Sequence, residues 1–101
     1  DNKIKEGSAM TFLNLASSFE NRPILGNRND VVCVLLSCLQ GGNSESTKEN
    51  AIRALGNISA CAENKLKLFH YRKGELVDVL LSIMCSETES TSLRRDALSV
   101  L

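Results

Sequence analysis

The sequence contains no tryptophan, and aromatic residues make up only 4% of its 101 residues. Hydrophobic residues nevertheless reach 43%, so a core must be built almost entirely from aliphatic side chains. Such a composition favours packed helices, and the length is enough for one small domain.

An excess of charge is also missing. Lys+Arg and Asp+Glu number 12 each, so the formal net charge is zero, which gives no sign of a polybasic nucleic-acid arm or of a basic membrane-surface patch. The longest apolar run falls far short of the ~18 residues that span a bilayer, and the start has no signal-peptide pattern. We therefore expect neither a nucleic-acid nor a membrane partner.

Motifs for metal binding and catalysis are absent as well. His70 is the only histidine, and the cysteines at 33, 38, 61 and 85 form no C-x-x-C pair. One histidine is too few for a Cys/His zinc set and supports no catalytic triad. We interpret the cysteines as small buried free thiols, with a disulfide or a metal site as the alternative, and expect an intracellular, non-catalytic protein without a cofactor.

What the chain does contain is repetition. The segment KEGSAMTFLNLA (5–16) aligns with KENAIRALGNIS (48–59) at an offset of 43 residues, and the match continues to the pair Asn21 and Asn64. A repeat of this length is typical of helical solenoids.

The repetition extends through the rest of the chain with small shifts of register. DVVCVLLSCL (30–39) aligns with ELVDVLLSIM (75–84) at an offset of 45, and ENAIRAL (49–55) aligns with RDALSVL (95–101) at 46. The shifts fall between the predicted helices, where insertions are tolerated.

The spacing of apolar residues predicts the helices themselves. Ala51, Leu55 and Ile58 recur on one helical face, and Ser46 followed by Glu49 predicts a capping box at the start of that helix. A similar stripe is made by Ala9, Phe12, Leu13, Ala16 and Phe19. The predicted helices span 5–19, 22–27, 30–40, 47–61, 64–71, 74–85 and 92–101. The predicted core includes Leu35, Leu36, Leu55, Ile58, Leu80 and Leu81.

Two of these segments resemble the armadillo repeat family. ENAIRALGNIS (49–59) is similar to the third helix of an armadillo repeat, and LVDVLLSI (76–83) is similar to its second helix. HEAT repeats are a near neighbour, but they usually have two helices per unit. The resemblance implies an all-α fold, a right-handed α-solenoid of three-helix repeats. It divides the chain into the end of one repeat (1–20), a repeat at about 21–62 and a truncated repeat at about 63–101.

The chain opens and stops within third helices, and neither end resembles a polar capping repeat. We therefore expect it to be part of a longer chain.

The same resemblance implies that the third helices line a groove for an extended segment of a protein partner. In peptide-binding members, an Asn of the third helix clamps the ligand backbone, and Asn14 and Asn57 hold that position here. One side-chain amide offers both a donor and an acceptor, so it can satisfy a peptide unit. Alternatively, these amides bond to neighbouring backbone. The same faces carry Met10, Asn50 and Arg53, with Ser99 in the next helix.

One departure from the family bears on the partner. Nuclear-import adaptors place Trp four residues before the Asn, where this chain has Met10 and Arg53. This argues against basic import signals, and the Arg53 guanidinium favours an acidic or mixed-charge partner instead. The sequence therefore predicts a protein-interaction scaffold, with a structural spacer inside a larger solenoid as the alternative.

Overall fold

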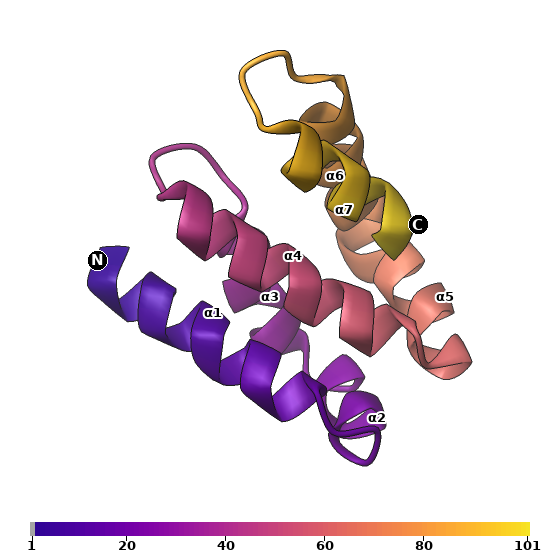
Figure 1. Cartoon of the computed structure of the whole chain (residues 1–101). Coiled ribbons are helices and arrows are strands. Elements are labelled where there is room, and N and C mark those ends of the chain that lie inside the picture. The colour runs from indigo at the N-terminus through magenta and orange to yellow at the C-terminus, as the bar shows by residue number, and fades with distance from the viewer. Residues whose placement is uncertain (1) are drawn as a thin grey trace.

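The protein is built from helices stacked side by side (Figure 1). A computed structural model describes residues 2–101, with only the backbone of Asn2, and this part of the chain contains no strand. The elements in chain order are α1 (Asn2–Ala16), α2 (Asn21–Gly26), α3 (Asn29–Cys38), α4 (Glu45–Ser59), α5 (Ala62–His70), the short 3₁₀ helix η1 (Tyr71–Gly74), α6 (Glu75–Cys85) and α7 (Thr91–Val100).

All seven predicted helices are present, and most of their ends agree with the prediction within two residues. The main difference lies in the first, which ends at Ala16 and not at residue 19. The chain turns after Ala16, with the Ser17 hydroxyl donating to the Leu13 carbonyl at 3.0 Å. Phe19 therefore does not belong to the buried stripe. It is exposed, and the Arg22 guanidinium lies 4.2 Å from the centre of its ring.

The start of α4 also differs from the predicted capping box. Ser44, not Ser46, is the N-cap residue, because its backbone is extended and its hydroxyl accepts the Thr47 N–H at 3.2 Å. Ser46 lies inside the first turn. Helix α7 begins in the same way, with the Ser90 hydroxyl accepting the Leu93 N–H at 3.1 Å. A serine hydroxyl thus satisfies one otherwise unpaired N–H at each helix start.

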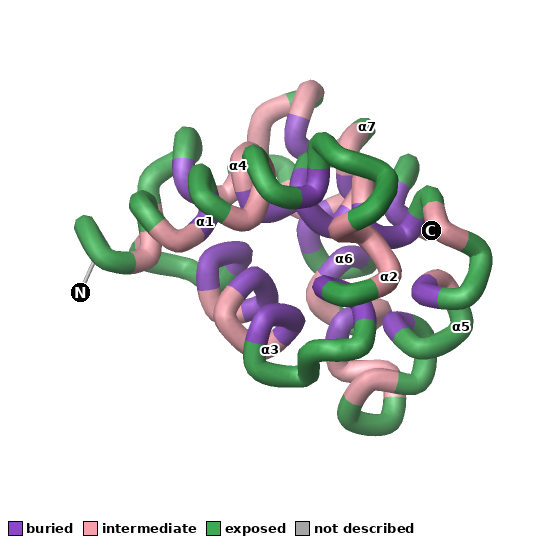
Figure 2. Tube along the Cα trace, turned by 90° about the horizontal axis from the view of Figure 1, so that it is seen from below, coloured by how far each residue is buried: buried purple, intermediate pink, exposed green. Residues whose placement is uncertain are grey.

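The helices form two layers. The helices α1, α4 and α7 lie side by side, with α4 in contact with both neighbours. The apolar helices α3 and α6 pack behind them, and α2 and α5 lie towards one end (Figures 1 and 2). Figure 2 shows buried segments where the two layers face each other and exposed turns around the outside. One continuous aliphatic cluster fills this interface.

The predicted core is largely confirmed, with one error. Leu35, Leu36, Leu55, Ile58 and Leu80 are buried, but Leu81 is substantially exposed. The exposed face of α6 consists of Asp78, Leu81, Ser82 and Cys85, which are spaced at i, i+3, i+4 and i+7. Leu81 therefore lies on the same face as the polar side chains of this helix.

All four cysteines are free, as predicted, but only Cys38 is buried. Burial raises the pKa of the Cys38 thiol, which donates to the Lys5 carbonyl at 3.6 Å. Cys33 and Cys61 are half-buried and Cys85 is exposed, so the prediction of buried thiols is wrong for these three. Cys33 and Cys85 lie on partly or fully exposed faces of α3 and α6, and Cys61 lies in the short connection between α4 and α5.

A buried asparagine ties successive parts of the stack together. The Asn64 amide donates to the Arg22 carbonyl at 2.7 Å and to the Ile58 carbonyl at 3.0 Å. Asn21, its partner in the sequence alignment, donates to the Leu15 carbonyl at 3.0 Å. The Asn64 side chain lies so close to Gly26 that a Cβ on this glycine would overlap it.

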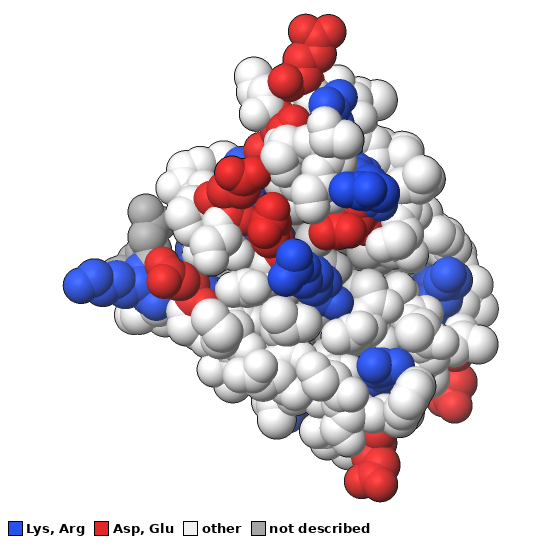
Figure 3. All heavy atoms as spheres, viewed as in Figure 1, with Lys and Arg blue, Asp and Glu red and all other residues white. Residues whose placement is uncertain are grey.

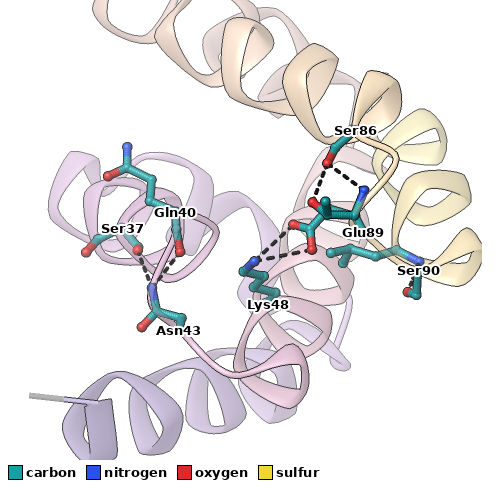
Figure 4. Close-up of polar contacts among 9 residues, drawn as sticks. Ser37, Gln40, Asn43, Lys48, Ser86, Glu89 and Ser90 are labelled. Atoms are coloured by element: carbon teal, nitrogen blue, oxygen red, sulfur yellow. Dashed lines mark hydrogen bonds and ion pairs between the residues drawn. The ribbon is translucent and has the colours of Figure 1, made fainter.

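An ion pair forms a second tie, near the other end of α4. The Lys48 ammonium lies 3.0 Å from Glu89 Oε2 and 3.3 Å from Oε1, joining α4 to the connection before α7 (Figure 4). Both side chains are largely shielded, at 15% and 18% exposed. In the neighbouring connection, the Asn43 amide donates to the Ser37 and Gln40 carbonyls and so closes the end of α3.

Candidate functional site

The layer formed by α1, α4 and α7 carries a shallow hollow of about 420 Å³. Leu13 of α1 stands at one wall, and Asp96 and Ser99 of α7 stand at the other. Four residues of α4 lie between them: Ile52, Arg53, Gly56 and Asn57. Three helices that are far apart in sequence thus contribute to one surface, which we call the third-helix hollow.

Three of the six predicted site residues line this hollow, namely Arg53, Asn57 and Ser99. The other three do not. Met10 and Asn14 are exposed on α1, and Asn50 is half-buried one turn before Arg53. On α1, Leu13 lines the hollow in place of Asn14, because Leu13 is the residue of this helix that faces α4.

The predicted set of site residues omits two features of the hollow. Asp96 lines the α7 wall, and the sequence alignment at offset 46 already pairs it with Asn50. Gly56 leaves an open floor, since a Cβ there would meet no atom within 4 Å. The alignment therefore carried a signal for Asp96, whereas the open floor depends on packing that no local pattern reports.

Asn57 is half-buried, and its amide makes no hydrogen bond within residues 2–101. Its donor and acceptor are both unused, in contrast to Asn64, whose amide is committed to two backbone carbonyls. A partly desolvated amide without a partner gains by binding one, since leaving such a group unpaired is unfavourable. Asn57 can therefore pair with a peptide unit placed in the hollow.

Arg53 and Asp96 place opposite charges in the same hollow. The Arg53 guanidinium lies 4.0 Å from Glu49 Oε2, at the outer limit of an ion pair, and such exposed pairs are weak. Asp96 has no ion-pair partner among the residues that the structure describes. The Ser99 hydroxyl, beside them, donates to the Asp96 carbonyl at 2.7 Å. Both charged groups remain open to a ligand.

The surrounding surface shows the same mixture of charge. Figure 3 views the face formed by α1, α4 and α7, and basic and acidic side chains lie interspersed over α4 and α7. The lower part of α1 is uncharged, consistent with the run GSAMTFLNLA at residues 7–16. No single sign of charge dominates the face.

Other kinds of site find little support in the described residues. No three His, Cys, Asp or Glu side chains within residues 2–101 are grouped as metal ligands would be. His70 lines a different hollow, at the end of α5. Across the same residues, no helix has both the length and the apolar character needed to cross a membrane.

Comparison with known proteins gives one match. The model of the armadillo/β-catenin-like repeat family matches residues 18–60, which run from the turn before α2 to the residue after α4. Neither the curated proteins nor the solved structures gave a match. Repeats of this family generally mediate protein–protein interaction and are generally non-catalytic. The match and the helical stack together support an armadillo-repeat assignment for residues 18–60.

Proposed function

We propose that the third-helix hollow binds an extended segment of a protein partner, so that the chain acts as a non-catalytic interaction scaffold. The observation that carries this proposal is the uncommitted Asn57 amide, half-buried in a hollow that three neighbouring helices build. Residues Met10, Asn14 and Asn50 extend the proposed contact surface beyond the hollow.

The charges of the hollow suit a partner of acidic or mixed charge. The planar Arg53 guanidinium has a geometry that matches carboxylates, whereas Asp96 would pair with a basic side chain of the same segment. Nucleic acid does not suit the site, because its phosphates would meet the Asp96 carboxylate beside a single arginine. We place such an interaction inside the cell, where four free cysteines are kept reduced.

A second function has its own support. Leu81 of α6 and Leu98 of α7 are large, apolar and substantially exposed, and they belong to the last two helices of the chain. Another helical unit packed on these helices would cover them, as expected if the helices continue a right-handed α-solenoid of three-helix repeats. In that case the chain is a structural spacer, and the binding surface lies elsewhere.

Variants of the hollow separate the two functions. We expect Asn57→Ala to weaken partner binding by about 1–3 kcal/mol, which corresponds to roughly 5- to 150-fold in affinity. We expect Arg53→Glu to abolish the binding of an acidic partner. Arg95→Glu is the matched control, because Arg95 is also an exposed arginine. It lies outside the hollow.

The measurement is affinity capture from cell extract with quantitative mass spectrometry, after circular dichroism has shown that each variant is folded. Loss of the same partners in both hollow variants, with retention in Arg95→Glu, supports the scaffold. If both hollow variants retain every partner, the third-helix hollow is not the binding surface and the spacer function is favoured.

A further inference from the structure

A second and larger hollow, of about 770 Å³, lies between the α2–α3 connection and the end of α5 with η1. It shares no lining residue with the third-helix hollow. Its walls carry the basic side chains Lys67 and Arg72, with His70 and Tyr71 beside them. No feature of the sequence brings these walls together, because they come from segments about 40 residues apart.

The charge of this second hollow is predominantly positive. Asp30 is its one carboxylate, and both of its oxygens are already occupied. Arg28 donates to them at 3.0 and 2.7 Å, and the Val31 N–H donates at 2.9 Å. The hydrogen bond from Arg28 lowers the pKa of Asp30, so this group stays ionised and paired. Asp30 is neutralised by Arg28, which lies outside the lining, and Arg72 pairs with Glu75, also outside it, so the group as a whole keeps a surplus of one positive charge.

The backbone at Arg72 adopts an unfavourable conformation that places its guanidinium at the wall. Arg72 and Lys73 both have left-handed backbone angles, with φ of 45° and 58°, which side chains other than glycine rarely adopt. The Arg72 guanidinium lies 3.5 Å from Cys33 Sγ, 3.6 Å from Glu75 Oε2 and 5.3 Å from the centre of the Tyr71 ring. These contacts fix its position, while most of its five N–H donors remain available.

The second basic group is also held in place. The Lys67 ammonium donates to Oδ1 of Asn27, across the junction between α5 and the end of α2. Lys67 has three donors, and one is used in this contact. Lys67 is oriented by a neutral amide, and Arg72 by a thiol and by the partly exposed Glu75 carboxylate. Together the two cations line a site for a compact group with more than one negative charge.

We infer that this second hollow binds a phosphate group, with Arg72 and Lys67 as its charged donors. A phosphate carries close to two negative charges near neutral pH and several acceptor oxygens, so it matches two cations better than a single carboxylate does. The phosphate can belong to a phosphorylated protein segment or to a small molecule, and the experiment distinguishes these sources. The inference is independent of the third-helix hollow.

The chain carries its own reporter for this site. Tyr71 lines the hollow and is the only tyrosine, and the sequence has no tryptophan. Its fluorescence therefore reports on this position alone. We expect inorganic phosphate to change the Tyr71 emission in a saturable manner, whereas sodium chloride at matched ionic strength leaves it unchanged. A change that follows ionic strength alone overturns the inference.

Two glycine substitutions provide a matched pair. Arg72→Gly and Lys73→Gly each remove one positive charge and each relieve a left-handed backbone angle, but only Arg72 lines the hollow. We expect the affinity for phosphate to fall about tenfold or more in Arg72→Gly. In Lys73→Gly it should stay within about twofold of the wild-type affinity. Calorimetry confirms the affinities, because Arg72→Gly also alters the surroundings of the reporter. Equal weakening in both variants overturns the inference.

Peptide probes then identify the source of the phosphate. A short phosphoserine peptide that binds more tightly than inorganic phosphate supports a phosphorylated protein segment, and equal affinities support a small phosphorylated molecule. A peptide with glutamate in place of phosphoserine is expected to bind at least about tenfold more weakly. If it binds as tightly as the phosphoserine peptide, the preference for phosphate is wrong.

Discussion

The middle and the outer parts of the stack carry aligned residues in different surroundings. Leu36 of α3 and Leu81 of α6 are aligned in sequence, yet they are 2% and 45% exposed. Ile52 of α4 and Leu98 of α7 are likewise aligned, and they are 1% and 57% exposed. Helix α4 lies between α1 and α7, whereas α7 has a neighbour on one side in the described structure.

Other aligned pairs show no such difference. Leu35 and Leu80 are both buried, and Ala51 and Ala97 are both fully buried. The apolar positions therefore fall into two classes. One class is buried in both aligned segments, and the other is buried in α3 and α4 but exposed in α6 and α7.

The largest effect should come from truncating a leucine of each class. Leu36→Ala and Leu80→Ala should each lower the free energy of unfolding by about 2–5 kcal/mol, the usual range for a buried leucine. Leu81→Ala should cost less than about 1 kcal/mol, because much of its side chain already contacts water. Urea denaturation measures all three. If Leu81→Ala is as damaging as Leu36→Ala, the assignment of classes is wrong.

Two helical glycines should respond in opposite directions to the same substitution. Gly26→Ala should destabilise the fold by about 1–3 kcal/mol, because its Cβ would overlap the Asn64 side chain. Gly56→Ala meets no atom and should stabilise α4 by about 0.5–1 kcal/mol. Thermal unfolding gives the sign of each change. Adding Asn64→Ala to Gly26→Ala should recover part of the packing loss, and strictly additive losses would show that the two side chains do not interact.

The asparagines compare a buried contact with a partly exposed one. Asn64→Ala should cost about 1–3 kcal/mol, since the Arg22 and Ile58 carbonyls lose a shared donor in a buried setting. Asn21→Ala should cost about 0.5–1 kcal/mol, because its single bond to Leu15 is exposed and water can replace it. Chemical denaturation of both variants checks the order. The reverse order would mean that Asn64 is not a tie between units.

The ion pairs should give the smallest effects. Lys48→Met should cost about 1 kcal/mol, because the Lys48–Glu89 pair is largely shielded from water. Arg28→Gln should leave stability unchanged within error, since the Arg28–Asp30 pair is exposed. High salt should reduce the difference between wild type and Lys48→Met only slightly. A strong salt dependence would show that the Lys48–Glu89 pair is as exposed to water as the Arg28–Asp30 pair.

A pH titration sharpens the same comparison. The Arg28 hydrogen bond lowers the pKa of Asp30, so any stabilising effect of this pair is present above the ordinary Asp range and disappears as the pH falls through the lowered pKa. Carboxyl NMR should show the pKa of Asp30 rising toward its usual value in Arg28→Gln. An unchanged pKa would mean that other contacts, such as the Val31 N–H, are responsible.

The helices were predictable because their apolar stripes recur with a helical period, and the meeting of Arg53, Asn57 and Ser99 was predictable from the alignment of α1, α4 and α7. The exposure of Leu81 was missed, because its apolar side chain suggested burial although Asp78 and Ser82 mark the same helical face as polar. Ser44 and Ser46 both suit a helix start, and only the extended backbone at Ser44 distinguishes them.

The tie at Asn64 and the second hollow also lay beyond the sequence. Asn64 aligned with Asn21, but the alignment does not reveal that its amide is buried between two carbonyls. The second hollow needs Arg72 in a left-handed conformation, which is rare for arginine and has no signature in the sequence around it.

The positions of the two ties have a mechanical consequence. Asn64 joins the successive units at the end of α4, and the Lys48–Glu89 pair joins them near its start. The contacts of Lys67 with Asn27 and of Arg72 with Cys33 join the same two parts of the chain. The stack is therefore fastened at both ends of α4, which fixes the spacing and register of the residues that α4 and α7 present to a ligand.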